Sequence, residues 1–177
     1  KHNTNPRDTY SLAKLLGENL TVLLNDTFHI PTVVFRFFNV YGPRQESSEY
    51  GFVAGVFIQQ VLEGKRPTVF GKGDQTRSFM YIEDNINICL DLFFNEQTNG
   101  HVVNVGNPRQ TAISDLAETI IRISGKEVIP EYLPARKVDT RYRTPDTTKM
   151  EEFSKAQITT RLEEGLRTTY EWYKNRF

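Results

Sequence analysis

The sequence predicts an α/β fold, because segments with helical periodicity alternate with short apolar runs that are typical of buried strands. The clearest helix spans residues 8–26, where leucines recur three or four positions apart and few helix-breaking residues intervene. The clearest strand is the β-branched and aromatic run at 31–37, which is followed by the Gly42-Pro43 turn. Together these segments form half of a βαβ unit, and in open α/β sheets ligands bind at the carboxyl ends of the strands.

The remaining elements follow in the same alternating order. Helices are expected at 52–63, 84–94, 113–124, 148–153 and 162–175, strands at 67–70, 77–82, 101–105 and 128–133, and polar loops at 39–50, 71–76 and 134–147. Asp84 is expected to be the N-cap of its helix, and Ser114 or Asp115 marks the start of the helix that ends at Gly125. No internal repeat or low-complexity linker interrupts this order.

Composition narrows the classes of protein that fit. With 177 residues and 38% apolar content, the chain can bury a core, and 22 basic against 22 acidic residues leave no positive field for nucleic acid. No run approaches 18 apolar residues, so no membrane span is expected. The one cysteine, Cys89, is expected to be a buried thiol and indicates a reducing, cytoplasmic setting. His2, His29 and His101 lack metal-ligand spacing, so no metal site is expected.

Tyr10 and Lys14 are the most informative pair in the chain. They lie four positions apart, on one face of the predicted helix at 8–26. A free phenol has a pKa of about 10. A neighbouring ammonium stabilises the phenolate, so such a pair can make a tyrosine that exchanges protons near neutral pH. Taken alone, the pair is weak evidence, because a Tyr and a Lys four positions apart occur by chance in many helices as a half-buried aromatic ring beside a solvated lysine.

Four segments, in order along nearly the whole chain, resemble the extended short-chain dehydrogenase/reductase family of nucleotide-sugar epimerases and dehydratases. They are the Tyr-x-x-x-Lys helix with the following Arg-Phe-Phe-Asn-Val-Tyr-Gly-Pro at 36–43, and the segments Val69–Asp84, Arg136–Asp139 and Leu162–Leu166. The resemblance implies the C-terminal part of an NAD(P)-binding Rossmann-like fold plus the smaller α/β substrate-binding domain. Residues 1–50 would end the Rossmann-like domain, and 51–177 would mainly bind the nucleotide sugar, with segments returning to the Rossmann-like sheet.

The usual dinucleotide fingerprint is missing from the chain. No Gly-x-x-Gly-x-x-Gly loop opens a strand-to-helix turn, and Gly71 and Gly73 are followed by no helix at the right place. In the family, that loop and a serine or threonine partner of the tyrosine precede the Tyr-x-x-x-Lys helix. The chain is therefore interpreted as the C-terminal portion of a longer enzyme, inactive by itself, with NAD as cofactor and NADP not excluded.

The resemblance assigns roles to individual residues. Tyr10 and Lys14 would be catalytic and contact the cofactor, and Phe37 would flank the nicotinamide. The positions matched to the nucleotide sugar are Asn39, Val53, Phe70, Arg77, Arg136 and Asp139.

Among these positions, Asn39 would contact the phosphates or the sugar, Phe70 would pack near the base, and Asp139 would bind ribose. Arg77 and Arg136, expected in loops on the ligand side, could clamp a diphosphate bidentately, although each could also be a solvated surface charge.

The implied reaction starts with oxidation of the sugar at C4. The 4-hydroxyl gives its proton to Tyr10 while hydride passes to NAD⁺, and the 4-keto sugar is then reduced on its other face or dehydrated. The wording at 36–45 and the Gln45–Tyr50 loop most resemble UDP-hexose 4-epimerases that act as homodimers when full length. A nucleotide-sugar 4,6-dehydratase, a UDP-glucuronate decarboxylase and a non-catalytic nucleotide-sugar-binding lobe remain alternatives.

Overall fold

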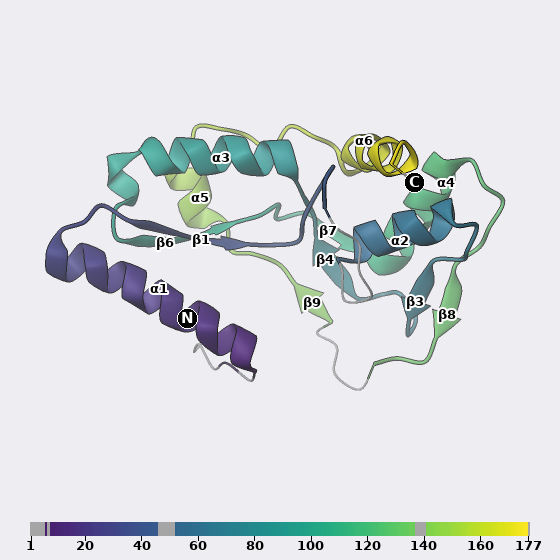
Figure 1. Ribbon diagram of the computed structural model, residues 1–177, viewed down its shortest axis with the longest axis horizontal. Coiled ribbons are helices and arrows are strands. Elements are labelled where there is room, and N and C mark those ends of the chain that lie inside the picture. The colour runs from purple at the N-terminus through teal and green to yellow at the C-terminus, as the bar shows by residue number, and fades with distance from the viewer. Residues whose placement is uncertain (1–5, 7, 46–51, 137–140, 177) are drawn as a thin grey trace.

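The structure, a computed structural model, describes residues 6, 8–45, 52–136 and 141–176 and confirms the predicted α/β architecture (Figure 1). The helices are α1 (Thr9–Phe28), α2 (Val53–Leu62), α3 (Ile82–Phe94), α4 (Ile113–Ser124), α5 (Thr148–Phe153) and α6 (Leu162–Lys174), with a 3₁₀ turn at Glu96–Thr98. The strands are β1 (Val33–Phe37), β2 (Val40–Tyr41), β3 (Thr68–Phe70), β4 (Thr76–Ser78), β5 (Met80–Tyr81), β6 (His101–Val105), β7 (Gln110–Ala112), β8 (Glu131–Leu133) and β9 (Tyr142–Arg143). Two hydrophobic cores lie along the long axis of the molecule.

The first core surrounds the parallel pair β1–β6, in which Val33 faces His101 and Phe37 faces Val105. Helix α3 lies on one side of this pair and α1 on the other (Figure 1). The buried residues of this core come from β5, α3, β6 and α5: Met80, Ile88, Leu92, Val103, Val105 and Met150. β1 and β6 are adjacent in space although more than sixty residues separate them, so the segment between them leaves the first core and returns to it.

Helix α1 is held to this core without a single buried residue among those described. Its N-cap is Asp8, whose carboxylate accepts a hydrogen bond of 2.6 Å from the Ser11 backbone N–H. Its apolar stripe, made of Leu12, Leu16, Leu20 and Leu23, is exposed by 47%, 54%, 61% and 52%. A patch of this kind is typical of a surface that packs against another structure.

The second core joins α2, α4 and α6 to two small sheets. One is the parallel pair β3–β8, and the other has the order β7–β4–β9, with β4 antiparallel to β7 and parallel to β9. The interior is formed by large side chains including Phe57, Ile58, Leu116, Ile120 and Leu166, all less than 3% exposed. The division into two domains at residue 50 stays a prediction.

One helix start and the cap of another helix differ from the sequence prediction. Helix α3 begins at Ile82 with Tyr81 as N-cap, two residues before Asp84. The buried carboxylate of Asp84 instead accepts hydrogen bonds from the Thr159 hydroxyl (3.0 Å) and the Thr160 N–H (3.0 Å), across to the α5–α6 connection. Helix α4 begins at Ile113, as predicted, but it has no side-chain cap, so neither Ser114 nor Asp115 caps it.

Other local expectations were only partly correct. The predicted strand at 77–82 is two short strands, β4 and β5, and three further strands, β2, β7 and β9, lie in segments for which no strand was predicted. Cys89 is half-buried rather than buried, and this burial raises the pKa of its thiol to about 11. A thiol with so high a pKa stays protonated at neutral pH and is a poor nucleophile.

Candidate active site

A cleft of about 890 Å³ opens between α1 and β1. Its helical wall includes Tyr10, Lys14 and Glu18, and its other wall is β1, which ends at Phe37, together with the following residue Phe38. Tyr10 is 71% exposed, and the Lys14 Nζ lies 5.5 Å from the centre of its ring. The two side chains predicted to share a helix face therefore do so, and both border the cleft.

Polar ties fix how the helix crosses the strand. The Arg36 guanidinium donates from Nε to Glu18 Oε2 (2.7 Å) and from Nη2 to Glu18 Oε1 (2.5 Å). The Thr32 hydroxyl donates to the Thr21 carbonyl (3.1 Å) near the start of the strand. The Glu18 carboxylate, mainly by hydrogen bonding, raises the pKa of the Arg36 guanidinium. Glu18 contacts Arg36 and the later Thr21 contacts the earlier Thr32, so α1 runs antiparallel to β1. Tyr10, near the start of α1, therefore lies toward the carboxyl end of β1.

The carboxyl end of β1 carries two of the predicted site residues. Phe37 is the last residue of the strand and is 57% exposed, so it is not a core residue of the described chain. Asn39, two residues later, has φ 44°, a left-handed conformation that asparagine adopts more readily than most residues. Its carbonyl accepts from the Met80 N–H (3.2 Å), which fixes the turn from β1 into β2. Both residues lie at the sheet edge where ligands of α/β proteins bind.

A second group of predicted residues meets at the carboxyl ends of β3 and β8. These strands pair in parallel, with Phe70 facing Leu133. Arg136 follows β8, and its guanidinium carbon lies 4.2 Å from the centre of the Phe70 ring. An exposed guanidinium stacked on an aromatic face keeps its outward N–H donors available for an anion.

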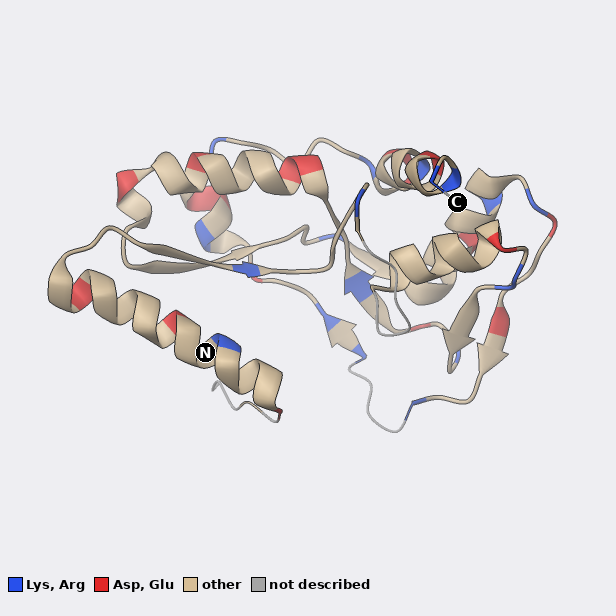
Figure 2. Cartoon of the chain, viewed as in Figure 1, with Lys and Arg blue, Asp and Glu red and all other residues tan. Residues whose placement is uncertain are grey.

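Arg77 is in strand β4, consistent with the predicted strand at 77–82, and not in the ligand-side loop expected from its assigned role. Its position follows from the backbone pairing of β4 on both sides, with Thr111 on β7 and Arg143 on β9 opposite Arg77. The half-buried guanidinium donates from Nη1 to the Thr76 carbonyl (2.7 Å). Residues in register on neighbouring strands project from the same face of a sheet. Arg77 and Arg143 are therefore neighbours, and both β4 and β9 carry blue Lys or Arg segments in Figure 2.

Sequence reasoning missed Arg143, because it lies in a polar stretch that had been assigned no strand. Two residues further on, the buried Pro145 lies beside Gly106, which follows β6, with its Cγ 3.1 Å from the position of a Cβ added to Gly106. The Asn104 side-chain amide, on β6, donates to the Asp146 carbonyl (3.0 Å). Strand β9 therefore leads from the arginine-bearing sheet to the carboxyl edge of β1–β6.

The other predicted positions contribute less. Val53 is the first residue of α2 and packs, half-buried, against the second core, so its described contacts are those of a packing residue. Asp139 and most of the Gln45–Tyr50 loop lie outside the described residues. In the part of the chain that the structure describes, no three His, Cys, Asp or Glu side chains are grouped to hold a metal ion. No described helix is both long enough and apolar enough to cross a membrane.

Comparison with known proteins identifies the family. The model of the NAD dependent epimerase/dehydratase family matches residues 1–106. A UDP-N-acetyl-alpha-D-glucosaminuronate decarboxylase from Bacillus cytotoxicus is 30% identical over 175 residues, which are 95% of this chain and 54% of that protein. A putative UDP-glucose 4-epimerase from Methanocaldococcus jannaschii is 31% identical over 177 residues, 98% of this chain and 56% of that protein.

A solved structure shows the same likeness in three dimensions. UDP-glucuronic acid 4-epimerase from Bacillus cereus, in complex with UDP-glucuronic acid and NAD, superposes with a TM-score of 0.85 at 31% identity. The match covers 100% of this chain and 58% of that one, and this chain spans about half the length of the curated relatives above. The predicted cofactor, NAD, is the one that the family description and this complex name. Since the family model matches residues 1–106 of 177, this chain belongs to the NAD-dependent epimerase/dehydratase family.

Proposed function

We propose that this chain carries the Tyr-Lys pair and the nucleotide-sugar-binding lobe of an NAD-dependent UDP-hexose 4-epimerase that works through a 4-keto intermediate. The observation that carries the proposal is the cleft at the carboxyl end of β1, bordered by Tyr10 and Lys14. The stack of Arg136 on Phe70 supports the proposal, because it places an aromatic ring that can pack against a nucleotide base beside a cation that can bind phosphate.

The residues of the cleft fit the nicotinamide end of NAD. The Lys14 ammonium can donate hydrogen bonds to ribose hydroxyls, and the exposed ring of Phe37 offers an apolar surface to a flat heterocycle. When bound, NAD supplies a hydride acceptor, and later a hydride donor, for C4 of the sugar.

Tyr10 and the arginines divide the remaining work. The Tyr10 oxygen takes the proton of the 4-hydroxyl and returns it at the end of the cycle, which requires that the hydroxyl come within about 2.6–3.2 Å of it. Arg77 and Arg136 hold the diphosphate by charge-assisted hydrogen bonds. While Arg77 and Arg136 hold the diphosphate, the hexose can turn its other face toward the cofactor without leaving the protein.

One observation favours a second candidate, a UDP-glucuronate decarboxylase. Arg143 is exposed next to Arg77, on the strand that leads back toward the cleft, so a cation lies beyond the two assigned to the diphosphate. A hexuronate carries one more anionic group than a hexose, and arginine binds carboxylates bidentately. Oxidation at C4 makes a uronate a β-keto acid, whose carboxylate leaves as CO₂. The relative from Bacillus cytotoxicus is named as a decarboxylase of such a sugar.

Product analysis separates these reactions. The natural polypeptide that contains this chain is incubated with NAD and either UDP-glucose or UDP-glucuronate, and the products are identified by mass and by chromatography. A 4-epimer of unchanged mass supports the first proposal, and loss of CO₂ from UDP-glucuronate supports the second. Tyr10→Phe should lower turnover of the accepted substrate about 10²- to 10⁴-fold, the usual contribution of a positioned acid-base group. Near-normal turnover by a folded Tyr10→Phe variant would refute both.

A further inference from the structure

The ion pair between Arg36 and Glu18 joins the helix of the Tyr-Lys pair to strand β1. Both guanidinium contacts are short, at 2.7 and 2.5 Å, and each uses a different carboxylate oxygen. The Glu18 side chain is only 16% exposed, whereas that of Arg36 is 42% exposed. A bidentate pair with one largely buried partner fixes distance and orientation more tightly than a single surface contact.

The pair is placed where it can affect the chemistry. Glu18 lies four residues after Lys14, one helical turn away and on the same side of α1. Arg36 immediately precedes Phe37, the last residue of β1. The ion pair therefore lies one helical turn from Lys14 and one residue from Phe37, both of which border the cleft.

Among the described residues, this ion pair is also the polar contact between α1 and the β1 segment that lies nearest to Tyr10 and Lys14. Thr21 is tied to Thr32 further along α1, but no hydrogen bond or ion pair joins the described residues 9–17 to β1. The first nine residues of α1, which include Tyr10 and Lys14, thus extend from an anchor at Glu18. A small rotation at that anchor would move the Tyr10 oxygen relative to anything bound beside Phe37.

We propose that Arg36, acting through Glu18, is a positioning residue that sets where Tyr10 and Lys14 stand over the cleft. The proposal rests on the proposed function, since it assigns Arg36 to the same reaction. Reaction rates are sensitive to such placement, and a misplacement of about 1 Å can cost about 10²-fold in rate.

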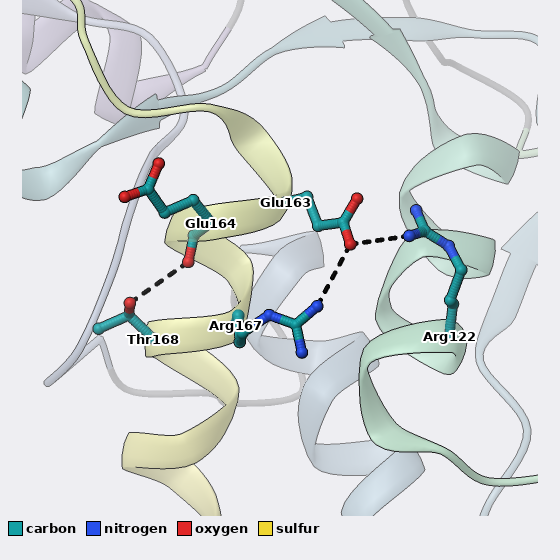
Figure 3. A network of polar contacts seen from close by, with 5 residues as sticks. All are labelled: Arg122, Glu163, Glu164, Arg167 and Thr168. Atoms are coloured by element: carbon teal, nitrogen blue, oxygen red, sulfur yellow. Dashed lines mark hydrogen bonds and ion pairs between the residues drawn. The ribbon is translucent and has the colours of Figure 1, made fainter.

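The second core offers a matched control. Arg122 on α4 donates to Glu163 Oε1 on α6 at 2.7 Å, and Arg167 donates to the same oxygen at 3.3 Å (Figure 3). This pair also joins two separate elements, and neither α4 nor α6 contributes to the lining of the cleft between α1 and β1. Replacing Arg122 therefore removes an inter-element ion pair without changing how α1 is held.

The test compares Arg36→Met, Glu18→Gln, the double variant and Arg122→Met in the natural polypeptide. Steady-state kcat and KM are measured with the nucleotide sugar and saturating NAD, together with amide hydrogen exchange of residues 9–17. We expect Arg36→Met and Glu18→Gln each to lower kcat about 10- to 100-fold. KM should change less than about twofold, because Arg77 and Arg136 are untouched. The double variant should be no worse than either single variant, because both singles break the same tie.

Exchange at residues 9–17 should be faster in the Arg36 and Glu18 variants than in Arg122→Met. A kcat equal to that of Arg122→Met, additive losses in the double variant, or unchanged exchange would overturn the positioning role. If Arg36→Met fails to fold, Glu18→Gln and the double variant decide the question, because neither leaves a buried carboxylate unpaired. Absence of nucleotide-sugar turnover in the unmodified protein would instead refute the proposed function, and the exchange measurement would still report whether the tie holds the helix.

Discussion

Replacing Arg136 by alanine should weaken binding of UDP strongly while leaving the fold intact. The guanidinium lies 4.2 Å above the Phe70 ring on the exposed end of the β3–β8 pair. Its loss removes a charge-assisted hydrogen bond to phosphate, which contributes about 1.5–3 kcal/mol. Since 1.4 kcal/mol corresponds to a factor of ten, the Kd for UDP should rise about 10- to 150-fold. An exposed cation–π contact contributes only about 0.5–1 kcal/mol, so the free energy of unfolding should change little.

Isothermal titration calorimetry of the natural polypeptide with UDP measures this change directly. Arg66→Ala is the matched control, because Arg66 lies at the opposite end of the same strand pair. There it donates to the carbonyls of Ile129 (3.0 Å) and Pro130 (2.9 Å). The control should lose some stability and keep its affinity for UDP. Unaltered affinity in Arg136→Ala would return this arginine to the status of a surface charge and would remove the nucleotide site from the end of β3–β8.

Three further outcomes are expected. Lys14→Met should lower turnover by orders of magnitude with little change in Tm, because the exposed ammonium supports the chemistry and not the core; rates and thermal unfolding measured on one preparation check this, and normal turnover contradicts it. Hydrogen bonds from Lys155 N–H, the Ser154 hydroxyl and Ala156 N–H lower the pKa of the Asp91 carboxyl below 3.8. The resulting stabilisation of the folded state is present above about pH 4 and is lost as the pH falls through the folded-state pKa. The difference in urea midpoint between wild type and Asp91→Ala should therefore become smaller in acid. A difference that does not change with pH would contradict this role of Asp91. The 177 residues alone should bind no NAD in equilibrium dialysis, since they lack a glycine-rich β-α turn, and should self-associate in sedimentation through the exposed leucines of α1; a monodisperse monomer that binds NAD tightly would refute both expectations.

Local patterns determined much of this protein. The helix at 113–124 has the predicted bounds, and α1 and α6 differ from theirs by at most two residues at either end, because their apolar residues recur at the helical period. The common face of Tyr10 and Lys14 also follows from this period, since two residues four apart in a helix are neighbours whatever surrounds them. The same period places Leu12, Leu16, Leu20 and Leu23 along one stripe of α1, and these leucines are exposed in the structure.

Only the tertiary structure decided how the site is assembled. Strands β7 and β9 have three and two residues, which are too few for a periodic signal. They form by pairing with the two edges of β4. The register of β9 in turn places Arg143 next to Arg77, 66 positions earlier in the sequence. The stack of Arg136 on Phe70 and the tie of Arg36 to Glu18 likewise join different elements. Periodicity describes the face that one element presents, whereas pairing between distant strands depends on packing and backbone hydrogen bonds that form only when the whole chain folds.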